Sequence, residues 1–177
     1  LMDGSLVPNL QEGQLEAPAF QHYYIINSGL SQMFMGGAEL HPIATAPDLW
    51  IGIRELLAER PSARKYIWAY WGQLDGTSHL HGPDSERARA EFSSFSAAFK
   101  HHFLDLLTPE ARQDTLVILT SDHGQISTDP GADQYDLKNH PEFTEMLHML
   151  PTGENRLAYL YLKPGRVAAA QEYIQAP

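Results

Sequence analysis

The sequence has no cysteine among its 177 residues. Disulfide bonds and thiolate nucleophiles are therefore excluded, and any metal ion would have to be held by histidine, aspartate or glutamate. Basic residues are also scarce, because 12 lysines and arginines stand against 22 aspartates and glutamates, which leaves a net charge of −10 at pH 7. This balance predicts no nucleic-acid-binding face, since such a face must be basic.

Targeting signals and long apolar runs are lacking as well. The first residues contain no basic segment and no small-residue cleavage site, and no run is long enough to cross a bilayer. We therefore expect a soluble chain without a membrane segment, and the cytoplasm is the favoured compartment. The start at Leu1 rather than at methionine indicates a piece of a longer protein.

What the sequence does contain is an alternation of strand-like and helix-like segments. Short apolar runs predict strands at 20–27, 65–71, 115–120 and 156–162, and helical spacing predicts helices at 47–61, 84–107, 141–150 and 166–175. Alternating elements of this kind predict an α/β fold, with a mostly parallel sheet covered by helices on both faces. Residues 1–19 are expected to form a loop or excursion, and residues 20–177 the α/β core of a single partial domain.

The longest predicted helix carries an apolar stripe. Its Asp84-Ser85 start is typical of a helix N-terminus. Four phenylalanines follow at helical spacing, and we interpret them as core packing rather than as a cofactor site: Phe92, Phe95, Phe99 and Phe103.

Candidate chemistry lies in the loops that follow two of the apolar strands, where open parallel sheets bind their ligands. The first loop, GQLDGTSHLHGPDS, contains Asp75, His79 and His81, and the second, SDHG, contains Asp122 and His123. Carboxylate oxygen and imidazole nitrogen together suit zinc or a similar transition metal. Two such pairs from neighbouring strand ends would place two ions close together, as in two-metal hydrolases, and would bring the carboxyls of Asp75 and Asp122 together.

Each loop taken alone has a plainer explanation, because an aspartate in a turn often lies beside a surface histidine. His81 is open between a third ligand, a substrate contact and a solvent-facing residue. A Ser-His-Asp hydrolase is a competitor, since Ser78, Ser85 and Ser121 lie near histidines and aspartates. No G-x-S-x-G elbow supports it, however.

The two motifs together resemble the type I phosphodiesterase/nucleotide pyrophosphatase family of the alkaline phosphatase superfamily. The stretch Asp75-Gly-Thr-Ser-His79-Leu-His-Gly-Pro83 is similar to the family motif P-D-x-x-G-H-x-x-G-P, and Ser-Asp122-His123-Gly-Gln125 is similar to S-D-H-G-M. Leu74, Ser78 and Gln125 depart from those motifs at positions that supply no metal ligand.

The resemblance implies an alkaline-phosphatase-like α/β/α fold and a hydrolase of phosphate esters with phosphodiester or pyrophosphate bonds. It implies two divalent metal ions, usually zinc, with manganese and iron as alternatives. Asp75 and His79 would bind one ion, and Asp122 and His123 the other. A threonine or serine nucleophile would form a covalent phospho-enzyme, which water then hydrolyses. The implied partner is a small-molecule phosphate ester.

The family's nucleophile, a further aspartate ligand and a further histidine ligand have no match in this chain. Met2-Asp3-Gly4 only superficially resembles the aspartate motif. We therefore expect an incomplete site, inactive by itself, whose remaining parts come from the rest of the parent catalytic domain. The alternatives are a non-catalytic α/β module that binds a metal ion or a partner, and a sibling activity such as a phosphatase, sulfatase, phosphonate hydrolase or mutase.

Overall fold

A computed structural model describes residues 7, 10, 12–59, 62–127, 136–154 and 157–175. The chain divides into two compact units, Leu1–Ser127 and Thr128–Pro177, and each is described by itself. Strands and helices alternate along the chain, and the α/β fold class predicted from the sequence is confirmed. Among the described residues, no helix is both long enough and apolar enough to cross a membrane.

The first unit is built on a three-stranded parallel sheet in the order β2-β1-β3. Its strands are β1 (Pro18–His22), β2 (Glu39–Ile43) and β3 (Trp68–Ala69). The central strand β1 is buried along its whole length and pairs Phe20 with His41 on one side and with Ala69 on the other. The predicted strands at 20–27 and 65–71 are therefore present but shorter, and β1 begins two residues before the expected core.

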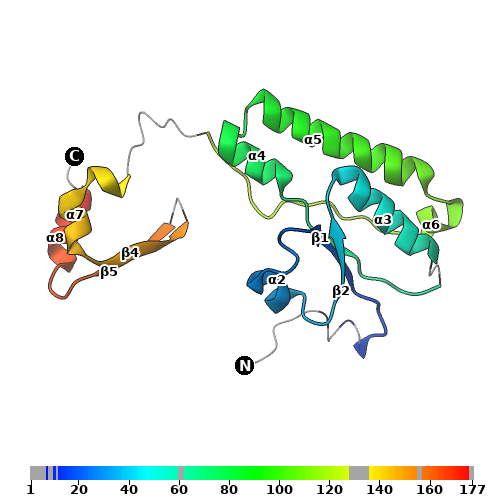
Figure 1. Ribbon diagram of the computed structural model, residues 1–177, viewed down its shortest axis with the longest axis horizontal. Helices are drawn as coiled ribbons and strands as arrows, with labels where there is room; N and C mark the ends of the chain where they lie inside the picture. The colour runs from blue at the N-terminus through cyan, green and yellow to red at the C-terminus, as the bar shows by residue number, and fades with distance from the viewer. Residues whose placement is uncertain are drawn as a thin grey trace. The chain divides into compact units, whose positions relative to one another are not determined.

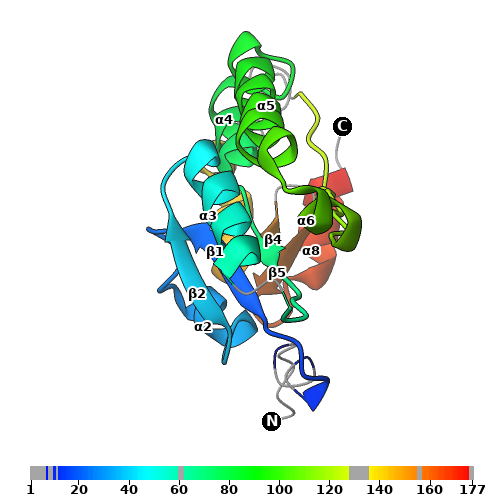
Figure 2. The ribbon, with the colours of Figure 1, turned by 90° about the vertical axis from the view of Figure 1, so that its right-hand side faces the viewer.

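Helices lie on both sides of this sheet, as expected. In Figure 1, α2 (Gly29–Phe34) and α3 (Ala46–Glu59) stand on opposite sides of β1 and β2. Next to α3 runs α5 (Glu86–Ala98), which continues into a π-helix at Phe99–Phe103 and a short 3-10 turn at Leu104–Leu106. The shorter helices α4 (Gln73–His81) and α6 (Pro109–Asp114) complete the unit, and Figure 2 shows α3 and α5 from the side.

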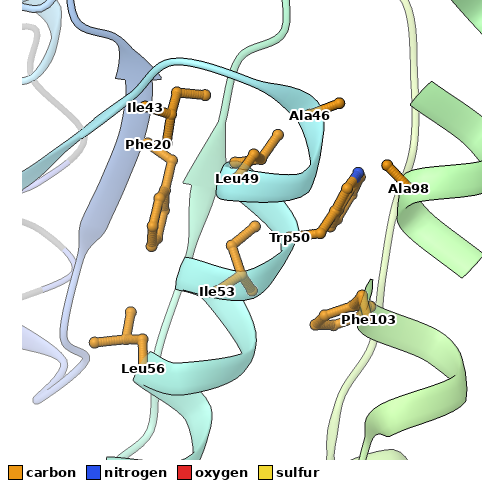
Figure 3. Packing of buried hydrophobic residues seen from close by; sticks show 9 residues of the cluster. All are labelled: Phe20, Ile43, Ala46, Leu49, Trp50, Ile53, Leu56, Ala98 and Phe103. Atoms are coloured by element: carbon orange, nitrogen blue, oxygen red, sulfur yellow. The ribbon is translucent and has the colours of Figure 1, made fainter. Parts of the chain in front are cut away.

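Helix α3 is the centre of the core because both of its flanks are covered. Figure 3 shows Phe20 and Ile43 of the sheet against one flank of α3, while Trp50 of α3 lies toward Ala98 and Phe103. The Trp50 ring lies 4.5 Å from the ring of Phe99 and 5.5 Å from that of Phe103, centroid to centroid. The core thus joins the sheet, α3 and the end of α5 into one cluster.

The N-terminus of α3 is fixed by reciprocal hydrogen bonds. The backbone N–H of Asp48 donates to Thr45 Oγ1 at 3.2 Å, and Asp48 Oδ2 accepts from the backbone N–H of Ala44 at 2.8 Å. One N–H of the first helical turn and the N–H of Ala44, just before the helix, are satisfied in this way. The helix consequently starts where the sequence predicts it and holds its apolar face against β1.

The phenylalanine stripe of the long helix is only partly core. Ser85 caps α5 as predicted, since its Oγ accepts from the backbone N–H of Ala88 at 3.1 Å. Phe103 is buried, and Phe95 and Phe99 pack against the core cluster. The side chain of Phe92, in contrast, is about half exposed. The prediction was wrong for Phe92 because α3 covers only the C-terminal part of this stripe.

The predicted strand at 115–120 does not form. No described residue pairs with this segment in a β-ladder, and Leu116 and Ile118 are 83% and 78% exposed. Apolar β-branched composition favours a strand only where a neighbouring strand supplies hydrogen bonds and a covered face. Here β3 pairs with β1 over two residues, and no second ladder is built on its other edge within the described residues.

The second unit contains α7 (Pro141–Met146), the antiparallel strands β4 (Leu147–Glu154) and β5 (Leu157–Leu162), and α8 (Val167–Gln175). Phe143, Leu147 and Ala170 form its small core. The helices were predicted correctly, although α7 is shorter than 141–150. The predicted strand at 156–162 exists, but it is an exposed hairpin strand rather than a buried parallel one, because it pairs with the strand directly before it.

Gly153 makes that hairpin possible. Its φ of 117° is accessible to glycine, and a Cβ at this position would collide with the backbone oxygen of Leu157. We expect Gly153→Ala to remove hydrogen-exchange protection from the β4–β5 amides. Gly165→Ala is the matched control, because Gly165 also has a positive φ of 78° but open space around its Cα, so it should cost only about 1–2 kcal/mol. Equal loss of protection in both variants would contradict the collision.

Candidate active site

Asp75 and His79 lie one turn apart on helix α4, which follows β3. The helix ends at Gly82, whose φ of 88° favours glycine and whose backbone N–H donates to the Ser78 carbonyl at 2.8 Å. One helical turn brings His79 Nε2 to 3.4 Å from Asp75 Oδ1. The expected convergence of this pair on a helical turn is therefore present.

Asp122 and His123 lie on the irregular segment after residue 120 rather than at the end of a strand. Asp122 Oδ1 accepts from the backbone N–H of His123 at 3.1 Å, and His123 Nδ1 lies 3.1 Å from the Gly124 carbonyl oxygen. With Nδ1 as the donor in that contact, Nε2 carries the lone pair that can accept a proton or bind a cation. This Nε2 lies 3.9 Å from Asp122 Oδ2.

The two motifs meet at Asp75. His123 Nε2 lies 3.9 Å from Asp75 Oδ1, the same oxygen that His79 approaches. The carboxylates of Asp75 and Asp122 both contact one imidazole, although they come from segments about fifty residues apart. We call Asp75, His79, Asp122 and His123 the Asp/His cluster.

Gln125 ties the two motifs together and was not singled out as a site residue from the sequence. Its amide nitrogen donates to Asp75 Oδ1 at 2.6 Å. A charge-assisted hydrogen bond of this length holds the carboxylate in place. The only signal in the sequence is that Gln125 stands where the family motif has methionine, and a methionine could not make this bond.

Tyr70 is the second residue that the sequence did not reveal. Burial raises the pKa of its phenol, and the negative charges of Asp122 and Asp75 raise it further. The phenol therefore stays protonated at neutral pH beside the two carboxylates. The sequence could have indicated Tyr70 only by its position just after β3. That position was assigned to the apolar strand at 65–71 instead.

His81 lies apart from the Asp/His cluster in its interactions. Its ring nitrogens are 3.0 Å from an Arg87 guanidinium nitrogen, and the side chain is exposed. A guanidinium can only donate, so it engages an imidazole lone pair that a metal or a proton would otherwise use. The solvent-facing interpretation of His81 is the one that this contact favours.

Two of the three serines of the competing hydrolase hypothesis are engaged in helix structure, whereas Ser121 lies on the exposed irregular segment beside Asp122. Ser78 donates to the Leu74 carbonyl at 2.7 Å, and Ser85 caps α5. Neither hydroxyl is aimed at an imidazole. The aspartate in Met2-Asp3-Gly4 lies outside the described residues.

In the Asp/His cluster, the aspartate and histidine of each motif form a pair that could supply two ligands to one cation. Two ligands of a tetrahedral zinc ion lie about 3.3–3.6 Å apart when each bond is about 2.0–2.2 Å, and the 3.4 Å between Asp75 Oδ1 and His79 Nε2 falls in this range. The second pair is more open at 3.9 Å. Within the described ranges, no three histidine, aspartate or glutamate side chains are grouped closely enough to hold an ion. The residue types and one pair spacing therefore fit a metal, but the ligand number does not reach three.

Comparison with known proteins agrees with this chemistry. A model of the type I phosphodiesterase / nucleotide pyrophosphatase family matches residues 35–176, which include all four residues of the Asp/His cluster. The chain belongs to this family. Searches of curated proteins and of solved structures found no match.

Membership points to a hydrolase of the phosphodiesterase and pyrophosphatase type, and a small-molecule phosphate ester fits the family as substrate. The family is generally metal-dependent. The match begins after β1 and spans both compact units, so the family relationship covers most of the sheet-and-helix core together with the hairpin unit.

Proposed function

We propose that this chain carries two of the about three protein ligands of each metal site of a two-metal hydrolase of phosphate esters. Asp75 and His79 would hold one divalent ion, and Asp122 and His123 the other, with zinc preferred and manganese or iron as alternatives. The observation that carries the proposal is the Asp75 carboxylate, whose Oδ1 lies 3.4 Å from His79 Nε2 and 3.9 Å from His123 Nε2.

Charge supports the need for cations. Asp75 and Asp122 each lie 3.9 Å from the His123 imidazole, and two carboxylates so placed would repel a phosphate anion bound at the Asp/His cluster. The bound ions would supply the positive charge that stabilises the phosphoryl oxygens and activates the attacking oxygen. The chain's own residues position that charge: α4 fixes Asp75, and Gln125 orients its carboxylate.

We further propose that the 177-residue chain does not turn over substrate by itself. Two protein donors for each ion give weak binding, because metal sites in enzymes of this type use about three. Ser78 and Ser85 are engaged in helix structure, and the family's threonine or serine nucleophile has no matching motif in this chain, so we infer that the nucleophile comes from the rest of the parent catalytic domain.

Calorimetric zinc titration of the whole chain tests the site. We expect weak binding that His123→Ala reduces about tenfold, while His148→Ala, an exposed imidazole in the second unit, leaves it unchanged. Equal affinities of the two variants would contradict the proposed site.

The whole chain, with zinc added, should not hydrolyse bis(p-nitrophenyl) phosphate. Zinc-dependent turnover that Asp122→Ala abolishes would show that the chain is active by itself.

A further inference from the structure

A pocket of about 650 Å³ lies in the first unit, between helix α2 and the face of the sheet turned away from α3. Its volume is in the range that holds small organic ligands. The metal hypothesis leaves this pocket without a role, yet Asp122 of the Asp/His cluster is one of its lining residues. The pocket and the candidate active site therefore share a side chain.

One wall of the pocket is aromatic because of strand alternation. Tyr66, Trp68 and Tyr70 are spaced two apart and line the pocket, whereas Ile67 and Trp71, at the alternate positions, pack against the core. The Trp68 and Tyr70 rings are nearly parallel, with 9° between their planes and 6.0 Å between centroids. This aromatic wall offers a large apolar contact surface to a ring that enters the pocket.

The opposite wall is apolar and largely open to solvent. It comes from α2, with Leu30 and Phe34 exposed and Met35 beside them. Ser28 and Ser31 also line the pocket, but the Ser28 hydroxyl donates to Ser31, and the Ser31 hydroxyl donates to the Ile25 carbonyl. Both hydroxyls therefore donate their hydrogen bonds within the local turn and not to a ligand.

Charge limits what the pocket can take. Of the described residues that line it, Asp122 alone carries a charge. An anionic group inside the pocket would meet no counter-charge, so the phosphate of a substrate must stay outside, at the Asp/His cluster. The apolar and aromatic lining favours an uncharged ring as the group that enters. We propose that this pocket binds the aromatic alcohol group of an aryl phosphate ester whose phosphorus lies at the Asp/His cluster.

This inference rests on the proposed function for the position of the phosphate, but not for the pocket itself. Two probes separate the two claims: 1-naphthol, which has the ring and no phosphate, and 1-naphthyl phosphate, which has both. Glycerol 2-phosphate is the control that has phosphate without a ring. Binding to the whole chain is followed by ligand-observed NMR titration, with and without zinc.

For the pocket, we expect 1-naphthol to bind and Phe34→Ala to weaken this binding about fivefold, because one of the large apolar side chains of the α2 wall is removed. Phe92→Ala is the matched control: the two phenylalanines are 55% and 53% exposed, and Phe92 lines a different and smaller hollow of about 360 Å³. Equal loss in both variants, or no binding by the unmodified chain, would overturn the aromatic pocket.

For the link to the site, zinc should tighten the binding of 1-naphthyl phosphate at least tenfold and leave the binding of 1-naphthol unchanged. In Asp122→Ala, zinc should tighten the binding of 1-naphthyl phosphate by a smaller factor. Glycerol 2-phosphate should bind more weakly than 1-naphthyl phosphate at the same zinc concentration. If 1-naphthol discriminates Phe34→Ala from Phe92→Ala but zinc has no effect on either phosphate, the proposed function fails while the pocket stands. If the two phosphates bind equally, the aryl specificity fails while the metal site stands.

Discussion

Phe103→Ala is expected to destabilise the first unit by about 3–5 kcal/mol, which is a large part of the stability of an ordinary domain. Phe103 is 1% exposed and packs against Trp50, which is the residue of α3 that faces the end of α5. Removing the ring leaves a cavity where α3, α5 and the π-helix meet. The buried surroundings cannot collapse easily, because the same cluster also holds Phe20 and Ile43 against the other flank of α3.

Urea unfolding followed by tryptophan fluorescence measures this effect cleanly. All three tryptophans, Trp50, Trp68 and Trp71, belong to the first unit, so the signal reports on that unit alone. Phe92→Ala is the control on the same helix and should cost less than about 1 kcal/mol, since that ring is largely exposed. Similar midpoints for the two variants would mean that Phe103 does not hold α5 to the core.

Asp75→Ala is expected to lower zinc affinity about 100-fold, the largest effect among the residues of the Asp/His cluster. Asp75 Oδ1 is the atom approached by both His79 and His123, so its loss weakens both motifs, whereas loss of either imidazole removes one donor. The Gln125 amide that is hydrogen-bonded to Asp75 loses its acceptor as well, which releases the second motif from α4.

Asp84→Ala controls for the loss of one negative charge. Asp84 Oδ2 accepts from the Ser127 hydroxyl at 2.8 Å and takes no part in the Asp/His cluster. Zinc titration by calorimetry should therefore give nearly the unmodified affinity for this variant. An equal loss in Asp75→Ala and Asp84→Ala would indicate that zinc is held by diffuse negative charge on the surface rather than by a defined cluster.

Local patterns in the sequence were sufficient for the four helices that were predicted, α3, α5, α7 and α8. Thr45 and Asp48 fix the start of α3, Ser85 caps α5, and the apolar spacing of Leu49 and Ile53 identifies the buried face. These signals act over three or four residues, so they can be read without knowing what lies across the core. The spacing of four between Asp75 and His79 is of the same kind.

The strands were harder to predict because a strand depends on its neighbour. The segments at 115–120 and 156–162 are equally apolar, yet the first stays unpaired and the second forms an antiparallel hairpin with β4. Gly153, with a backbone conformation that other residues avoid, permits that reversal. Nothing in the apolar composition of either segment distinguishes these outcomes.

The sequence by itself determined the alternation of strands and helices, the acidic and cysteine-free chemistry, and the two motifs that mark the type I phosphodiesterase / nucleotide pyrophosphatase family. Only the tertiary structure decided that Asp75 is where the motifs meet, that Gln125 holds it, and that Tyr70 and Asp122 border an aromatic pocket. The physical reason is distance along the chain. Residue types and short spacings can be recognised within a few neighbouring residues. A contact of one carboxylate with a segment about fifty residues away forms only when the sheet and helices have packed.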